Sequence, residues 1–319
     1  MKFTIDESIR YFDFSDDCTN NENPSKEIKE RRIILCCPGF FASAKTLAKH
    51  ISAITDIAKA NGSKFDYSVI AIEWRGHGES GLTATSNDIL SVPILADDLN
   101  QLISHLLNSA DHANKYRKAK ISLLGHSMGV NVIWHYIRKY GDDLIEKHIF
   151  VDQPVAITGG KDAFANGYKK EWIIHSLFTA YIISFFIFLK RFWLAPLLWI
   201  SKPKWMSDET VDFLCKCSPY LWKLLIDTST KDNTFILPLV RKPCLLISGK
   251  ASFVSPDIAQ FIKSRVSGPA RVITYPAPYG THAPFFGHYC KDQELGKYGE
   301  RKFCEDAFAF LEEKVDRGD

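Results

Sequence analysis

The segment at 125–129, Gly-His-Ser-Met-Gly, carries the sharpest chemical signal in this sequence. It lies between an apolar run and an amphipathic run, which predicts a tight turn from a strand into a helix. Such a turn strains the backbone of the central serine, and glycines on both sides relieve the crowding. The serine hydroxyl then lies at a helix amino terminus, where backbone amides favour negative charge. Ser127 is therefore the predicted nucleophile.

The elements that must position this serine follow an alternating pattern. Short apolar runs alternate with longer amphipathic ones, as in a mostly parallel sheet with helices on both faces. Strands are predicted at 1–7, 10–14, 33–37, 67–73, 120–124, 148–151, 244–248 and 271–275, and the first two form an edge hairpin. Helices are predicted at 44–60, 94–108, 130–140, 255–266 and 302–315. The expected fold class is α/β, with a doubly wound, eight-stranded sheet.

Together these segments resemble the α/β-hydrolase superfamily nearly end to end. Pro38-Gly39-Phe40 follows the third strand, where the family usually has His-Gly-x. The segment at 73–80, Glu-Trp-Arg-Gly-His-Gly-Glu-Ser, resembles a structural turn of the family, so His77 is not expected to be catalytic. The resemblance implies that the backbone N–H groups of Phe40 and Met128 form the oxyanion hole.

The resemblance also selects a base among the ten histidines. The loop after the last strand delivers the base in the family, and His282 lies there in a His-x-Pro-Phe sequence. His126 lies inside the turn, where relatives pack it beside the nucleophile. His288 is the remaining rival because it follows closely in the same loop. We expect His282 to be the base.

The acid departs from the common pattern. Most relatives carry it after the seventh strand, but Ser252 occupies that position here, and a hydroxyl cannot offset the charge of an imidazolium. Asp152 ends the sixth strand, where some relatives carry their acid, among them chloroperoxidase-like, dehalogenase-like and lactonase proteins. Asp257 is the competing acid, but we expect it in the first turn of a helix. Asp152 is the preferred assignment.

Residues 155–240 interrupt the pattern, so 1–154 and 241–319 are assigned to the core and 155–240 to an inserted helical cap. Five of the seven tryptophans lie in this insertion, and its run from Trp172 to Leu189 has no charged residue. A membrane span would separate two halves of one sheet, so a cap over a pocket is expected. The predicted substrate-binding residues are Phe41, Trp172, Phe178 and Trp193. A cap that contacts a membrane surface is the alternative.

Composition excludes several classes. The formal charge of +3, from 40 basic and 37 acidic residues, argues against a nucleic-acid partner. The eight cysteines form no CxxC pair and no metal-ligand spacing, so neither a metal nor another cofactor is expected. The first residues lack an apolar signal core. Reduced cysteines in a cytoplasmic protein are the favoured interpretation, and the oligomeric state is left open.

These residues predict a function. A serine nucleophile argues against dehalogenase and epoxide-hydrolase chemistry, which need a carboxylate. We expect acyl-enzyme chemistry on an ester or lactone of a bulky hydrophobic substrate, because an aromatic cap binds by desolvation. Thioester and carbon–carbon bond hydrolysis use the same triad and stay open, and perhydrolysis is a candidate side activity. A non-catalytic ligand receptor and a membrane-associated lipid hydrolase or acyltransferase are the alternatives from other classes.

Overall fold

The computed structural model describes residues 2–5, 9–14, 29–81, 90–108, 116, 118–155, 212–213, 216–218, 220–252, 254–287 and 290–313. These ranges include all eight strands of the sheet. Most of the predicted insertion, at 156–211, lies outside them.

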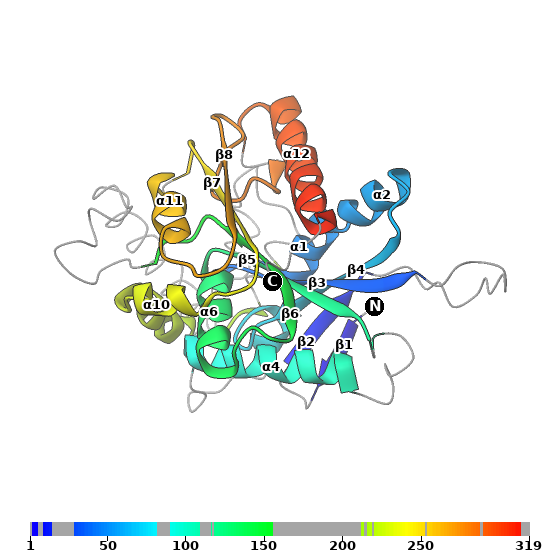
Figure 1. Cartoon of the computed structure of the whole chain (residues 1–319). Coiled ribbons are helices and arrows are strands. Elements are labelled where there is room, and N and C mark those ends of the chain that lie inside the picture. Colours follow the sequence, from blue (N-terminus) through cyan, green and yellow to red (C-terminus); the bar gives the residue numbers. More distant parts are fainter. Residues whose placement is uncertain are drawn as a thin grey trace.

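One eight-stranded sheet forms the centre of the molecule (Figure 1). Its order is β1-β2-β4-β3-β5-β6-β7-β8. β1 pairs with β2 and β2 with β4 antiparallel, and the other neighbours are parallel. The predicted fold class is confirmed. The strands are β1 (Lys2–Ile5), β2 (Ile9–Asp13), β3 (Glu30–Cys37), β4 (Phe65–Glu73), β5 (Lys120–His126), β6 (Ile145–Val151), β7 (Cys244–Gly249) and β8 (Ala270–Tyr275).

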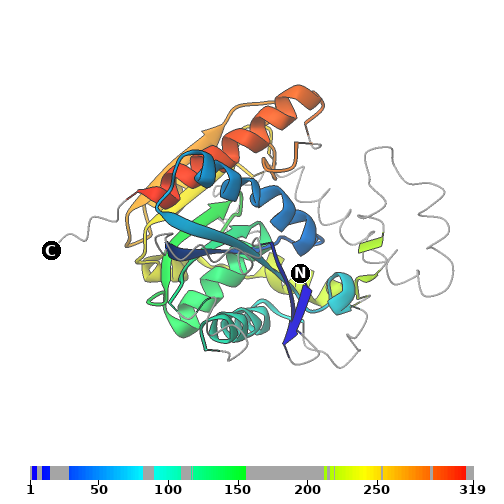
Figure 2. The ribbon, with the colours of Figure 1, turned by 90° about the vertical axis from the view of Figure 1, so that its right-hand side faces the viewer.

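Helices cover both faces of the sheet. One face packs against α1 (Ala44–Ile51), α2 (Ala53–Ala60) and α12 (Gln293–Glu312). The other packs against α4 (Val92–Asn108), α6 (Met128–Tyr140), α10 (Leu221–Thr230), the 3-10 helix η3 (Thr234–Leu239) and α11 (Asp257–Lys263). Figure 2 shows α12 and α2 on the same side of the sheet, in agreement with their direct packing. A short helix, α3 (Gly78–Gly81), follows β4.

The central strands are apolar because both of their faces are buried. Along β3, Ile33, Leu35 and Cys37 enter the core cluster on the α6 side, while Ile34 and Cys36 enter the cluster on the α12 side. This is the two-residue alternation of a strand. Both β3 cysteines are completely buried and act as small apolar core residues, and burial raises the pKa of both thiols.

Two helix predictions need correction. The predicted helix at 44–60 is two helices, because the chain turns at Ser52, whose hydroxyl donates to the Lys49 carbonyl while Thr55 bonds the Ser52 carbonyl. The last helix begins at Gln293 rather than at 302. Asp292 caps it by accepting from two backbone N–H groups of the first turn.

The described part of the insertion is helical at α10 and η3. The first residue of the insertion, Val155, lies beside its returning part, because the Asn233 N–H donates to the Val155 carbonyl at 2.9 Å. Asn233 also bonds the side chains of Asn131 and His135 on α6, which ties the returning chain to the core. Among the helices that the structure describes, none is long and apolar enough to span a membrane.

Candidate active site

Ser127 lies in the turn between β5 and α6, as predicted. Its φ of 50° and ψ of −126° are strained for a residue with a side chain. Gly129 lets α6 approach the end of β3, because a Cβ there would lie 2.0 Å from the Cys37 carbonyl oxygen. Gly125 is similarly crowded, with the Val130 nitrogen 2.9 Å from such a Cβ. The glycines are therefore required by close packing around the turn.

Backbone hydrogen bonds fix this turn to the sheet. The Ser127 N–H donates to the Val151 carbonyl at the end of β6 (3.0 Å), and the Ser127 carbonyl accepts from Val130 (2.8 Å). Met128 is the first residue of α6. N–H groups in the first turn of a helix have no intrahelical acceptor, so they can face an anion. This supports the predicted use of the Met128 N–H.

The loop after β3 lies directly against the turn. A Cβ on Gly39 would be 3.0 Å from the Ser127 Cβ, so the two residues are in contact. The buried Trp74 indole donates to the Pro38 carbonyl at 2.8 Å and anchors the loop from β4. Phe40, the predicted second oxyanion donor, follows at once. Its neighbour Phe41 has a φ of 56°, and their rings are 4.2 Å apart.

The predicted contact between base and acid is present. His282 Nδ1 lies 2.7 Å from Asp152 Oδ2. Asp152 follows β6 with a φ of 51°, and its N–H donates to the Ile247 carbonyl at 2.8 Å. The rival, Asp257, begins α11, is exposed, and accepts from the Ser255 hydroxyl at 3.3 Å. Asp152, and not Asp257, contacts His282.

Asp152 is almost completely buried, with 3% of the residue exposed and none of its side chain. Burial raises the pKa of Asp152, while hydrogen bonds from His282, the Ser252 hydroxyl and the Gly249 backbone oppose that rise. Ser252 is thus part of the site as a donor to Asp152. The sequence indicates only that Ser252 stands where most relatives carry the acid. Its hydrogen bond to Asp152 could not be predicted, because Asp152 follows β6 while Ser252 follows β7, 100 residues further along the chain.

His126 joins the base loop to the nucleophile turn. Its Nε2 lies 3.0 Å from the His282 carbonyl oxygen, so Nε2 carries the proton and donates. The two rings are 4.8 Å apart. Burial lowers the pKa of His126 well below its usual value. A neutral, buried ring of this kind fits the expected packing role rather than that of a base.

His77 is also a structural residue. It is buried beneath Phe40, with ring centroids 5.8 Å apart at near right angles. Burial lowers the pKa of His77 to about 4. The ring therefore packs against the loop after β3 through Phe40. Of the predicted substrate-binding residues, Phe41 lies beside this loop, while Trp172, Phe178 and Trp193 fall outside the described residues, as does His288.

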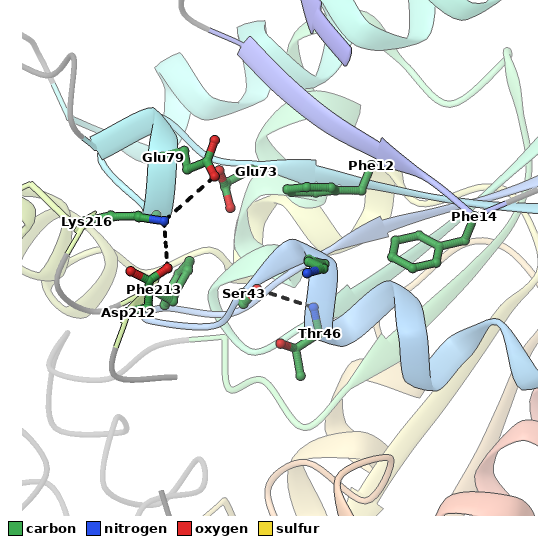
Figure 3. A pocket seen from close by; sticks show the side chains of 11 residues that line it. Phe12, Phe14, Ser43, Thr46, Glu73, Glu79, Asp212, Phe213 and Lys216 are labelled. Carbon is green, nitrogen blue, oxygen red and sulfur yellow. Dashed lines mark hydrogen bonds and ion pairs between the residues drawn. The ribbon is translucent and has the colours of Figure 1, made fainter. Parts of the chain in front are cut away.

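A cleft of about 460 Å³ opens between β2, α1 and α3 (Figure 3). Phe12 and Phe14 are among its lining residues, and Lys216, which also lines it, forms ion pairs with Glu79 and Asp212. None of its described lining residues belongs to the Ser127 site, so we do not assign it as the substrate pocket. Within the described ranges, no group of three or more His, Cys, Asp or Glu residues could hold a metal ion.

Solved structures share this fold. A bromoperoxidase from Bacillus anthracis matches with a TM-score of 0.64 and 19% identity, over 96% of this chain and 95% of that chain. An esterase from Exiguobacterium antarcticum matches with a TM-score of 0.62 and 16% identity, over 96% of both chains. A thermophilic esterase from Thermogutta terrifontis matches with a TM-score of 0.57 and 16% identity, over 94% of both chains. No curated protein matches the sequence.

The strand order and the turn at Ser127 define an α/β-hydrolase fold. The profile of the family described as serine aminopeptidase, S33, matches residues 29–157. This stretch includes Ser127 and Asp152 but not His282. The partial profile match and the shared fold support an α/β-hydrolase.

Proposed function

We propose that this protein is a serine hydrolase that acts through an acyl-enzyme on an ester or lactone of a bulky hydrophobic substrate. The observation that carries the proposal is the 2.7 Å contact between His282 Nδ1 and Asp152 Oδ2, next to a strained serine turn. A buried carboxylate at Nδ1 keeps Nε2 of the same ring unprotonated, so Nε2 can accept a proton from the serine hydroxyl.

The mechanism follows from these roles. Ser127 Oγ attacks the carbonyl carbon while His282 Nε2 takes its proton. The Phe40 and Met128 N–H groups donate to the oxyanion that forms. The carbon–oxygen bond to the leaving alcohol breaks, and His282 returns the proton to that oxygen. Water, deprotonated by His282, then attacks the acyl carbon, the bond from that carbon to Ser127 Oγ breaks, and His282 returns the proton to Oγ as the acid leaves. Asp152 stays ionised and stabilises the imidazolium in both halves.

The substrate class rests on aromatic composition. Phe40 and Phe41 pack against the core beside the serine turn, and five tryptophans occur in the insertion. Aromatic surfaces bind apolar groups by desolvation. We keep Trp172, Phe178 and Trp193 as proposed contacts of the substrate, and 155–240 as the proposed cap. Esterases among the similar structures favour an ester over a thioester or a carbon–carbon bond.

The test is a turnover screen. The purified chain is assayed against p-nitrophenyl esters of increasing acyl length and lactones of increasing ring size. We expect hydrolysis that rises with the size of the apolar group and is lost in Ser127→Ala. Equal turnover by wild type and Ser127→Ala would contradict the proposal, as would the absence of turnover across both series.

Location and partners are proposals of the same kind. We propose a cytoplasmic protein with a small hydrophobic substrate and no nucleic-acid partner. Six cysteines in the described residues are buried thiols, and burial raises the pKa of Cys244 and Cys304 to about 12, which protects such thiols from oxidation. Peripheral membrane contact through the cap is the alternative, which vesicle co-sedimentation would reveal.

A further inference from the structure

Ser252 contributes a second hydrogen bond to the oxygen of Asp152 that His282 contacts. The Ser252 hydroxyl donates to Asp152 Oδ2, which also faces His282 Nδ1. The direction of this bond is fixed by chemistry, because an ionised carboxylate only accepts. The Ser252 oxygen is itself an acceptor for the Val254 N–H at 3.0 Å. Its single hydrogen is therefore directed to Asp152.

The backbone around Ser252 holds this hydroxyl in place. The Ser252 N–H donates to the Gly249 carbonyl at the end of β7 (3.1 Å), and the preceding N–H, of Ala251, reaches the Gly280 carbonyl (2.8 Å). The turn after β7 is thus bound to the loop that carries His282. A Cβ on Gly249 would lie 2.0 Å from the Gly280 oxygen, so the two loops are closely packed.

We propose that Ser252 is a positioning residue of the proposed reaction, which orients Asp152 toward His282 and keeps its carboxylate ionised. This inference rests on the proposed function, since it assigns Ser252 a task within the same site. Ser252 occupies the position where most relatives carry the acid. A hydroxyl therefore stands here in place of a carboxylate, and it donates a hydrogen bond to the carboxylate of Asp152 after the neighbouring strand.

Removal of the hydroxyl has a defined electrostatic consequence. Asp152 is buried, and burial alone favours its protonated form. Without the Ser252 donor, the ionised carboxylate of Asp152 loses one of the hydrogen bonds that stabilise it, so Asp152 takes up a proton at higher pH. The active form, with Asp152 ionised, is consequently lost at higher pH.

Few other titratable groups lie close enough to Asp152 and His282 to change the pH dependence of the reaction. Among the described residues, His126 contacts His282 from β5, and burial lowers its pKa well below its usual value. Lys250 and Asp257, on the segments that flank Ser252, are exposed. Salt therefore screens the two exposed charges, and measurements in about 0.5 M salt isolate the contribution of Ser252.

The experiment measures the rate of inactivation by a fluorophosphonate against pH. The pH–rate profile of the wild type is expected to show an acid limb, in which the rate falls at low pH as Asp152 takes up a proton. In Ser252→Ala we expect that limb to move up by about one pH unit, as for the loss of one hydrogen bond to a charged group, and the plateau rate to fall about tenfold. Ser252→Thr, which keeps the hydroxyl, should restore the wild-type limb.

Controls separate positioning from stability. Ser248→Ala removes another buried hydroxyl of β7, which bonds Thr274 Oγ1 at 3.0 Å and not the pair, and it should leave the limb unchanged. Ser252→Cys keeps the volume with a weak donor, and should behave like Ser252→Ala even if the latter fails to fold. A wild-type limb in Ser252→Cys or Ser252→Ala overturns the proposal. No labelling of the wild type would instead overturn the proposed function.

Discussion

The indole N–H of Trp74 donates to the Pro38 carbonyl at 2.8 Å, and this bond joins the end of β4 to the loop that carries the Phe40 amide. The bond is completely buried, so the carbonyl has no water to replace the indole. Trp74 therefore holds in place the loop that carries the proposed oxyanion donor, Phe40. The same hydrogen bond connects the turn after β4 with the site at the end of β5.

The first prediction concerns this bond. Trp74→Phe removes the donor and keeps an aromatic ring. It should lower kcat about tenfold with KM nearly unchanged, because the Phe40 amide is needed most in the transition state. Trp134→Phe is the matched control. Trp134 is equally buried, but its indole nitrogen has no acceptor among the described residues. Equal effects of both substitutions on kcat would contradict the orienting role.

The second prediction concerns the space that glycine leaves. Gly129→Ala should cost about 3 kcal/mol of unfolding free energy and abolish fluorophosphonate labelling, because its Cβ would collide with the Cys37 carbonyl. Gly62→Ala tests strain without collision. Gly62 has a φ of +63° and nothing within 4 Å of a Cβ, so we expect about 1 kcal/mol and normal labelling. Urea denaturation measures both, and a smaller cost at Gly129 than at Gly62 would refute the packing argument.

The third prediction is a dependence of stability on pH. Burial lowers the pKa of His77 to about 4, from about 6.5 in an unfolded chain. Between these values the unfolded state binds more protons at His77, so the unfolding free energy falls as the pH falls from about 6.5 to 4. Since a tenfold change in proton affinity corresponds to about 1.4 kcal/mol, the loss from His77 alone approaches about 3 kcal/mol.

His77→Asn isolates this contribution, since it keeps a donor near the Arg75 carbonyl and removes the titration. We expect denaturant titrations at pH 7, 6, 5 and 4 to show a shallower loss of stability in the variant than in the wild type. Parallel curves would mean that His77 does not titrate in this window.

The fourth prediction concerns the acid. Asp152→Asn keeps the shape of the side chain and removes the charge that stabilises the imidazolium. We expect a loss of about 10⁴ in kcat, the cost of this change in the serine-protease triad. Asp257→Asn should have little effect, because Asp257 is exposed at the start of α11. Ser252→Asp added to Asp152→Asn should restore part of the activity. A loss in Asp257→Asn as large as in Asp152→Asn would contradict the assignment.

The fold could be predicted because strands buried on both faces appear in the sequence as apolar runs. Strand β3 is such a run, and it was placed correctly. The start of α12 was missed because Gly296 and Gly299 weaken the helical pattern, although both are needed for close packing against Gly287 and Tyr279. Helix α1 ends before Ser52, whose hydroxyl donates to the Lys49 carbonyl in competition with the backbone hydrogen bonds of the helix. This competition does not change the spacing of apolar residues, so the sequence pattern does not show it.

The site could be predicted only where local sequence carries it. Ser127 and His282 have neighbours that indicate their turns, and Asp152 is predicted as the acid because some relatives carry theirs after the sixth strand. The bond from Trp74 to Pro38 and that from Ser252 to Asp152 join segments 36 and 100 residues apart, so only the folded chain brings them together. The proposed lining by Trp172, Phe178 and Trp193 stays a prediction.

The most direct test of the central claim is the location of the fluorophosphonate adduct. The wild-type chain is labelled at about pH 8, where the imidazole of an unperturbed histidine is neutral, then digested and analysed by tandem mass spectrometry. We predict a single adduct on the Ser127 hydroxyl, with no adduct in Ser127→Ala and slow labelling in His282→Ala. An adduct on another residue, formed at the same rate in Ser127→Ala, would show that Ser127 is not the nucleophile.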